Sequence, residues 1–397
     1  MTVLRSELED RSVAAHLIAL AKLPGVGPGS LLRWHRGVGA AAALAKIRTG
    51  SPDAIRALAG PHHRPKDGVI TAMITGARSV DPEEELERHV DAGVRVLVLG
   101  QAGYPDRLAQ DPAPPAVLFA RGSFAALAGP TVAIVGTRNA TRVGRDFAAG
   151  LGAELTAAGV AVVSGLALGI DAAAHRGALH AFREGIEREA GTAPSAPVAV
   201  IASGLDIAYP RRHVELHQEI ATAGLLLSEV PLGERPTEWR FPARNRIIAG
   251  LSDAVVVAES RSKGGSVLTA GEGLDRGLPV LAVPGHPSAP SSAGTNDLIF
   301  DGAGLVRSTR DVLDAIGLDQ PVASPNTVAS TEPTLSATSQ LVLDAIADQP
   351  AALAEVVARC GLDLEDVSAS LTSLEVSGRV VRTAGWYERV GRGRSRS

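Results

Sequence analysis

The sequence has a single cysteine, Cys360, in 397 residues, and aromatic residues make up only 3% of it. One thiol excludes an internal disulfide framework and any zinc site built from several cysteines. So few aromatic rings argue against extensive base stacking of the kind that OB-fold proteins use. Apolar runs stay short of the roughly 20 residues that a membrane helix needs, and the N-terminal segment lacks the apolar stretch of a signal peptide. We therefore expect a soluble, cytoplasmic protein with no metal and no membrane partner.

The composition also lacks an excess of basic residues: 39 Lys and Arg face 43 Asp and Glu, a formal net charge of −4. A nucleic-acid partner must then be met by local clusters of Arg and Lys rather than by the net charge. Hydrophobic residues make up 45% of the chain, which is ample for packed cores. At about 100–200 residues per domain, the length predicts two or three domains.

Residues 1–78 are predicted to form a helical domain. Between its first two apolar helical runs lies Leu23-Pro24-Gly25-Val26-Gly27-Pro28-Gly29, the turn pattern of a helix-hairpin-helix (SAM-like) motif. The glycines of such a turn let backbone amides approach a phosphate, and the start of the next helix adds its positive end. A plain helical hairpin is the alternative, because only Arg33 and Arg36 follow as basic support.

Residues 79–316 alternate short apolar runs with stretches of helical length. Runs that are apolar throughout predict strands buried on both faces, as in a parallel sheet covered by helices. The segment is therefore predicted to be an α/β domain with an extended Rossmann-like, doubly wound, mainly parallel sheet. The expected strands are residues 96–99, 117–120, 132–135, 160–164, 198–202, 225–229, 254–259 and 280–283.

Residues 317–334 are polar and interrupted by proline, which predicts a linker. Residues 335–390 follow with three segments of helical length and a β-ribbon, the order of a winged-helix domain. Between residues 335 and 376 one basic residue, Arg359, faces seven acids, a balance that repels phosphates. We expect this domain to contact protein, and its only elements suited to DNA are Arg379, Arg382 and a basic tail at residues 391–397.

The first strand of the parallel set ends in Gly136-Thr137-Arg138 and precedes a helix. Glycine there lets the backbone approach an anion, and the Thr hydroxyl, the Arg side chain and the helix N-terminus supply donors, which predicts a phosphate site. The dinucleotide pattern Gly-x-Gly-x-x-Gly and the Walker A pattern are both absent from the sequence. Their absence argues against an NAD-dependent oxidoreductase and against an ATP-driven motor.

The loops that follow the predicted strands are rich in arginine and glycine. Because parallel strands point their carboxyl ends to one edge of a sheet, these loops should meet there. Such a basic edge predicts a site for an anionic polymer or a phosphorylated ligand. Residues 241–252 are expected to be a short basic loop that feeds the strand at residues 254–259. Bonds from its arginines to local carbonyls and carboxylates are the alternative.

Seven motifs follow one another in order at residues 133–138, 163–175, 204–210, 227–229, 241–252, 265–270 and 283–285. They resemble the motifs of the DNA-processing protein A family (DprA, also called Smf). The resemblance implies an N-terminal helical domain, an extended Rossmann-like domain that binds single-stranded DNA and forms a homodimer, and a C-terminal winged helix. It also implies protection of incoming single strands during natural transformation and loading of the RecA recombinase, with neither catalysis nor a cofactor.

The resemblance places the family's DNA pocket at Arg138, Arg211, Phe241 and Ser266 of this sequence. We combine these positions with the loops of the carboxyl edge. The expected DNA- and phosphate-binding residues are then Gly136, Thr137, Arg138, Ser164, Gly165, Arg211, Arg240, Phe241, Arg244, Asn245, Lys263, Gly265, Ser266 and Asn296.

The chain departs from the family in three places. Relatives often have a lysine where this sequence has Glu238, so either Arg240 takes that role or this side of the pocket is weaker. The family's Gly-Cys-Asn turn is Gly-Thr-Asn at residues 294–296, and residues 183–197 look like an insertion.

Two other functions are the alternatives. LOG-type nucleotide phosphoribohydrolases share the fold superfamily, and residues 263–269 with Glu272 resemble part of their signature. Asp171 and His175 stand four residues apart, as a general acid and base might, but we expect a helix cap and a structural hydrogen-bonding residue. The second alternative is a housekeeping recombination accessory protein in an organism that is not transformable.

Overall fold

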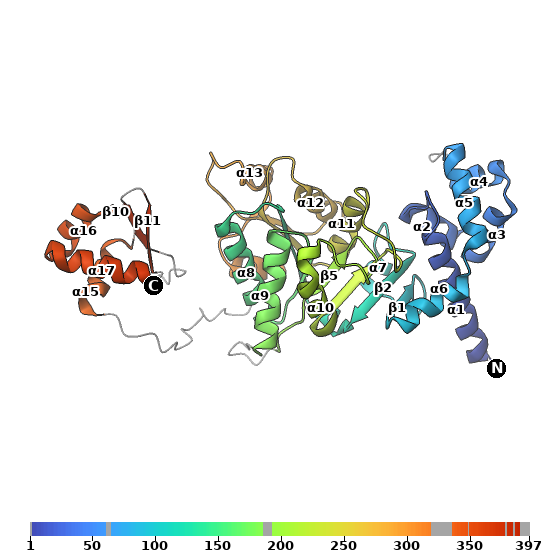
Figure 1. Cartoon of the computed structure of the whole chain (residues 1–397), viewed down its shortest axis with the longest axis horizontal. Helices are drawn as coiled ribbons and strands as arrows, with labels where there is room; N and C mark the ends of the chain where they lie inside the picture. The colour runs from blue at the N-terminus through green and yellow to red at the C-terminus, as the bar shows by residue number, and fades with distance from the viewer. Residues whose placement is uncertain are drawn as a thin grey trace. The chain divides into compact units, whose positions relative to one another are not determined.

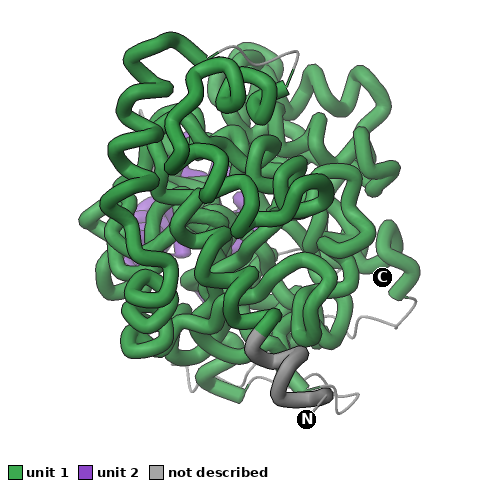
Figure 2. Tube along the Cα trace, turned by 90° about the vertical axis from the view of Figure 1, so that its right-hand side faces the viewer, with its two compact units in different colours: residues 1–321 green, residues 322–397 purple. Residues whose placement is uncertain are grey.

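Figure 1 shows the computed structural model of the chain, which describes residues 2–60, 65–185, 193–318, 336–347, 349–377, 379–383 and 386–389. Within these ranges no helix is both long and apolar enough to span a membrane. The chain divides into two compact units, residues 1–321 and 322–397 (Figure 2), and each is described by itself. Most of the expected linker 317–334, all of the basic tail 391–397 and the middle of the expected insertion 183–197 lie outside the described residues.

The first unit is built on a nine-stranded sheet with the strand order β1-β2-β6-β5-β4-β3-β7-β8-β9. Neighbouring strands from β6 to β9 run parallel, whereas β2 is antiparallel to both β1 and β6. The predicted α/β, mainly parallel sheet is therefore confirmed, except that β2 points its carboxyl end to the opposite edge. The strands are β1 (Arg95–Val98), β2 (Val117–Gly122), β3 (Thr131–Gly136), β4 (Ala161–Ser164), β5 (Val198–Ile201), β6 (Leu225–Ser228), β7 (Ala254–Glu259), β8 (Val280–Ala282) and β9 (Gly304–Leu305).

Apolar clusters cover both faces of this sheet, as its uniformly apolar strands require. In β2, Phe119 belongs to one cluster and its neighbours Leu118 and Ala120 to the other. In β5, Ile201 and Val200 divide in the same way. The covering elements are α7 (Asp106–Ala109), η1 (Phe124–Leu127), α8 (Arg142–Ala157), α9 (Ile170–Arg183), η2 (Arg211–His213), α10 (Val214–Ala223), α11 (Arg240–Gly250), α12 (Gly265–Leu274), α13 (Ala293–Phe300) and α14 (Thr309–Ala315).

The N-terminal helices share a core with the sheet. Leu17 and Trp34 lie in the same apolar cluster as Phe119 of β2. The ring of His89 packs on Phe119 with 4.9 Å between ring centroids, and its Nε2 accepts a 3.0 Å hydrogen bond from the amide of Leu232. The expected boundary at residue 78 therefore falls inside one compact unit. The helices are α1 (Thr2–Ala21), α2 (Pro28–Arg36), α3 (Ala40–Thr49), α4 (Pro52–Ala59), α5 (Asp67–Ser79) and α6 (Pro82–Asp91).

Residues 241–252 are helical over most of their length, and the expectation of a short loop there is wrong. Helix α11 begins at Arg240, so Pro242 lies in its first turn. The missing amide of a proline costs no hydrogen bond in that turn, because the first amides of a helix have no partner within it. The Phe-Pro pair therefore opens the helix instead of ending a loop.

The second unit has the winged-helix plan that its sequence predicts. Three helices enclose an apolar core, which includes Val356, Leu371 and Leu374, and a three-stranded sheet in the order β10-β12-β11 closes it. Trp386 and Val381 lie on the other face of that sheet and are 48% and 44% exposed. The elements are α15 (Ala337–Ala345), β10 (Ala351–Ala352), α16 (Leu353–Cys360), α17 (Leu364–Val376), β11 (Val380–Thr383) and β12 (Trp386–Arg389).

Candidate nucleic-acid interface

The loops after β3, β4 and β5 meet the segment before α11 around a pocket at the carboxyl edge of the sheet. Open α/β sheets generally place their ligands at this edge. We call this hollow the edge pocket. It is lined by Arg138, Gly165, Ala167, Leu168, Ile201, Ala202, Ser203, Tyr209, Pro210, Pro236, Phe241 and Arg244.

Phe241 lies at the centre of an aromatic and cationic cluster at the rim of the edge pocket. The guanidinium carbon of Arg138 is 4.7 Å from the centroid of its ring, and the ring of Tyr209 is 5.6 Å away. Arg138 is exposed, and Tyr209 is 45% exposed. A cation beside two accessible rings can pair with a phosphate while an unstacked base lies against an aromatic face.

Arg244 forms the floor of the edge pocket. Its Nη1 donates a 2.8 Å hydrogen bond to the carbonyl of Gly165 and a second, very short one to the carbonyl of Val200. The side chain is buried, and burial lowers the pKa of Arg244 to about 10, although the negative charge of nearby Asp171 acts to raise it. A Cβ at Gly165 would lie 2.5 Å from the guanidinium nitrogens, so only glycine fits there. Arg244 therefore bonds to backbone carbonyls, the alternative to a ligand-binding role that the sequence left open.

Asp171 and His175 lie below the pocket and not on its surface. The Asp171 carboxylate accepts hydrogen bonds from the amides of Gly165 at 3.2 Å and Ala167 at 3.4 Å. Burial raises the pKa of Asp171 and lowers that of His175 to about 3. Both residues are buried, so they are not placed to exchange protons with a ligand. Asp171 holds the loop after β4 but does not cap α9, whose N-cap is Gly169, and neither ring nitrogen of His175 has a hydrogen-bond partner among the described residues. The expected helix cap and the expected hydrogen-bonding role of His175 are therefore wrong.

A carboxylate of the protein binds Thr141, the N-cap residue of α8. Glu259, at the end of β7 and 4% exposed, accepts from the Thr141 amide at 3.1 Å and from its hydroxyl at 2.7 Å. The Thr141 hydroxyl in turn accepts from the amide of Gly144 at 3.0 Å, and a Cβ at Gly144 would overlap Glu259. A carboxylate at the N-cap disfavours a phosphate at this helix start, and Arg138 turns to Phe241 instead.

Two arginines near the start of α11 are held by internal carboxylates. Arg240 pairs with Glu234 at 3.1 Å and donates to the carbonyl of Arg235 at 2.6 Å. Arg246 pairs with Glu229 at 2.7 Å. Glu238 is exposed. Because Arg240 is already paired, it is not available to replace the lysine that relatives often have at position 238. The geometry therefore favours the other expectation, that this side of the pocket binds DNA more weakly.

The remaining expected residues divide between loop support and exposed positions. Arg211 and Lys263 are exposed. Ser164 donates to the carbonyl of Ile134 at 2.6 Å, Ser266 to Ser260 Oγ at 2.8 Å, and the side chain of Asn296 makes two 3.1 Å bonds with the backbone of Gly285. Of the fourteen expected positions, those that line the edge pocket are Arg138, Gly165, Phe241 and Arg244; those outside its lining are Gly136, Thr137, Ser164, Arg211, Arg240, Asn245, Lys263, Gly265, Ser266 and Asn296.

Sequence reasoning missed Tyr209 as a site residue. It precedes Pro210 in the loop after β5, and its ring faces Phe241. An aromatic residue just before a proline, at the carboxyl end of a buried strand, is the signal that could have identified it.

Replacing Arg244 should destabilise the fold, whereas replacing Arg138 should not. Arg244→Ala leaves two buried carbonyls without their donor and Asp171 without its nearby positive charge, so we expect the free energy of unfolding to fall by about 2–5 kcal/mol. Arg138→Ala is the matched control, expected to stay within about 0.5 kcal/mol because its side chain is exposed. Urea denaturation of the whole chain measures both, and equal losses in the two variants would contradict the floor role.

Comparison with known proteins agrees with this architecture. The sequence model of a family described as DNA recombination-mediator protein A matches residues 95–317, and that of the DprA winged helix domain matches residues 326–385. Protein Smf of Synechocystis sp. is 32% identical over 95% of this chain and 99% of its own length. DNA processing protein DprA of Bacillus subtilis is 36% identical over 58% of this chain and 74% of its own.

A solved structure extends the likeness to three dimensions. The X-ray structure of DNA processing protein A from Streptococcus pneumoniae superposes with a TM-score of 0.60 at 30% identity, covering 76% of this chain and 97% of that one. The chain therefore belongs to the DNA recombination-mediator protein A family, which includes proteins named DprA and Smf.

Proposed function

We propose that this protein binds single-stranded DNA at the edge pocket and acts as a recombination mediator. The observation that carries this proposal is the open cluster of Arg138, Tyr209 and Phe241, which offers a cation and two ring faces in one place. Bases of a duplex are stacked on one another, whereas those of a single strand can turn onto a protein ring. Family membership and the relatives' names, which refer to DNA processing, support the same class of ligand.

We propose further that the bound strand is incoming DNA in natural transformation, which the protein protects and transfers to RecA. This step rests on the family resemblance. A housekeeping role in recombination uses the same pocket and the same partner, so it remains the alternative for an organism that does not take up DNA.

The site does not favour a nucleotide phosphoribohydrolase. Glu259 binds Thr141 at the N-cap of α8, so negative charge already lies at this helix start. Asp171 and His175 are buried below the pocket. We therefore propose a binding protein with no cofactor and no catalytic reaction.

Arg138→Ala and Arg211→Ala should each weaken binding of single-stranded DNA without unfolding the protein. Both side chains are exposed at the carboxyl edge, and a lost charge-assisted hydrogen bond costs about 1.5–3 kcal/mol. Fluorescence anisotropy of a labelled oligonucleotide measures the change. Arg183→Ala is the matched control, because Arg183 ends the 14-residue helix α9 that leads away from this edge.

The salt dependence checks the mode of binding in the same experiment. If about 4–6 phosphates are contacted, log K should fall with log salt at a slope of about −3 to −4. Tighter binding to duplex than to single strands, or affinity that does not change with salt, would contradict the proposal.

We propose that the winged-helix domain contacts protein, with RecA as the candidate partner. Helix α17 holds the position of a recognition helix and contains no Lys or Arg, while Glu365 and Asp366 lie in its first turn. The outer face of the small sheet presents Trp386, which is 48% exposed. An acidic helix and, on a separate face, an exposed aromatic ring suit contacts with protein better than contacts with a phosphate backbone.

A chain that ends near Pro325 should bind single-stranded DNA almost normally. The first unit has its own apolar clusters, so removal of the second should leave the edge pocket folded. We expect the defect in RecA loading, measured as strand exchange on DNA coated with single-strand binding protein. A loss of DNA affinity beyond about tenfold, or about 1.4 kcal/mol, would instead assign DNA contacts to the wing or to the basic tail.

We propose that a second copy of the chain covers Phe300, at the end of α13. This side chain is 91% exposed, and the family resemblance implies a homodimer. Phe300→Ser should convert dimer to monomer, measured by mass photometry or sedimentation, and should leave the edge pocket intact. A variant that keeps the mass of the parent would contradict this contact.

A further inference from the structure

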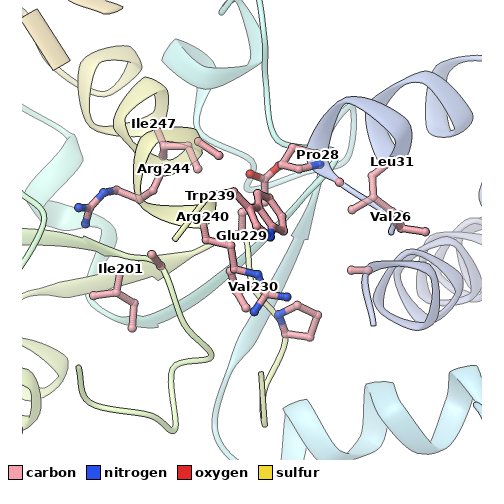
Figure 3. A pocket seen from close by; sticks show the side chains of 15 residues that line it. Val26, Pro28, Leu31, Ile201, Glu229, Val230, Trp239, Arg240, Arg244 and Ile247 are labelled. Carbon is pink, nitrogen blue, oxygen red and sulfur yellow. The ribbon is translucent and has the colours of Figure 1, made fainter. Parts of the chain in front are cut away.

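Two more hollows lie beside the edge pocket within the first unit. The middle hollow, drawn in Figure 3, shares Ile201, Ala202 and Arg244 with the edge pocket. It continues into an open groove beside the turn between α1 and α2, which we call the hairpin groove. The middle hollow and the hairpin groove share Val26, Gly27, Pro28, Trp239 and Ala243. The three hollows therefore lie in a row from the edge pocket to the hairpin turn, and each shares lining residues with the next.

Trp239 lies where the middle hollow meets the hairpin groove. Figure 3 shows its indole between Arg244 on one side and Pro28 on the other. The residue is 50% exposed, and the guanidinium carbon of Arg240 is 5.5 Å from the indole centroid. Trp34, in contrast, is 3% exposed and donates to the carbonyl of Leu58. Half of Trp239 is therefore accessible to a flat ligand, beside the guanidinium of Arg240.

The lining of the hairpin groove is open and contains Arg33 and Arg246 but no carboxylate. Because Arg246 is paired with Glu229, Arg33 is the side chain that contributes positive charge to the groove. Nη1 of Arg246 is buried without a hydrogen-bond partner among the described residues. A Cβ at Gly27 or Gly29 would meet nothing within 4 Å, so the backbone of the turn is accessible. Glu238 is exposed but lines neither the middle hollow nor the groove.

We infer that single-stranded DNA leaves the edge pocket across Trp239, which stacks one base, and continues along the hairpin groove. The next phosphates then lie beside Arg33 and the Gly27-Pro28-Gly29 turn. The row of hollows that starts at the edge pocket and the absence of carboxylates in the groove lining favour a nucleic acid over a protein segment; in the middle hollow the one carboxylate, Glu229, is paired with Arg246. This inference rests on the proposed function and assigns the hairpin turn, which a plain structural hairpin would leave unused, to the DNA path.

Tryptophan fluorescence tests the stacking step in the whole chain. The chain has three tryptophans, and Trp386→Phe leaves Trp239 as the exposed one beside buried Trp34. A thymidine oligomer of about 20 nucleotides, longer than most single-strand sites, should quench the emission, and Trp239→Phe in the same background should abolish the quenching. Anisotropy of the labelled oligomer reports binding independently. Binding without quenching would overturn this inference alone, whereas absence of binding would overturn the proposed function.

Oligomer length tests the path into the groove. Trp239→Ala should weaken binding of the long oligomer about tenfold, within the range found for one stacked base. It should hardly affect binding of an oligomer of about 5 nucleotides that fills only the edge pocket.

A charge at the hairpin turn tests the next step of the path. Gly29→Asp should weaken binding of the long oligomer severalfold, because the carboxylate repels phosphates, while Gly29→Asn, which is of equal size and neutral, should not. An acidic side chain in the first turn of a helix stabilises it, so we expect the Gly29→Asp variant to fold. If Gly29→Asp and Gly29→Asn bound the long oligomer equally well, the path would be contradicted. It would also be contradicted if Trp239→Ala weakened binding of the two oligomers by the same factor.

Discussion

The buried guanidinium of Arg244 is the interaction on which the binding edge depends. It joins the carbonyls of Gly165 and Val200, which lie at the carboxyl ends of adjacent strands β4 and β5. Both loops of the pocket wall start from those points, and α11 is fixed to them through the same side chain. Because a buried charge is costly without partners, any rearrangement that opens the carbonyl contacts is strongly opposed. The exposed residues of the rim can then be few and still be well placed.

Much of the fold could be predicted from the sequence, because the signals were local and strong. Uniformly apolar runs identified eight strands of the large sheet, and the acidic helices with their ribbon identified the winged helix. The carboxyl-edge rule then brought Arg138, Gly165 and Arg244 to one pocket, and the family resemblance added Phe241. Apart from the resemblance, each of these inferences needs only periodicity or strand direction.

The errors came from contacts between residues distant in sequence. Glu259 reaches the start of α8 across 118 positions, and no local pattern distinguishes a helix start that a carboxylate occupies from one that is open to a phosphate. Arg240 and Arg246 look like ligand donors until Glu234 and Glu229 are found beside them. The helix that begins at Arg240 was predicted to be a loop because of its Phe-Pro pair, since proline is compatible with a first helical turn as well as with a loop.

The apolar cluster that the N-terminal helices share with the sheet has a mechanical consequence. Leu17 and Trp34 on one side and Phe119 on the other belong to one packed core, so folding fixes the place of α1 and α2 relative to β2. A surface whose elements are fixed before binding loses little conformational entropy when a ligand binds to it. Because close-packed cores deform little, the hairpin turn should keep its place on the sheet when a ligand binds beside it.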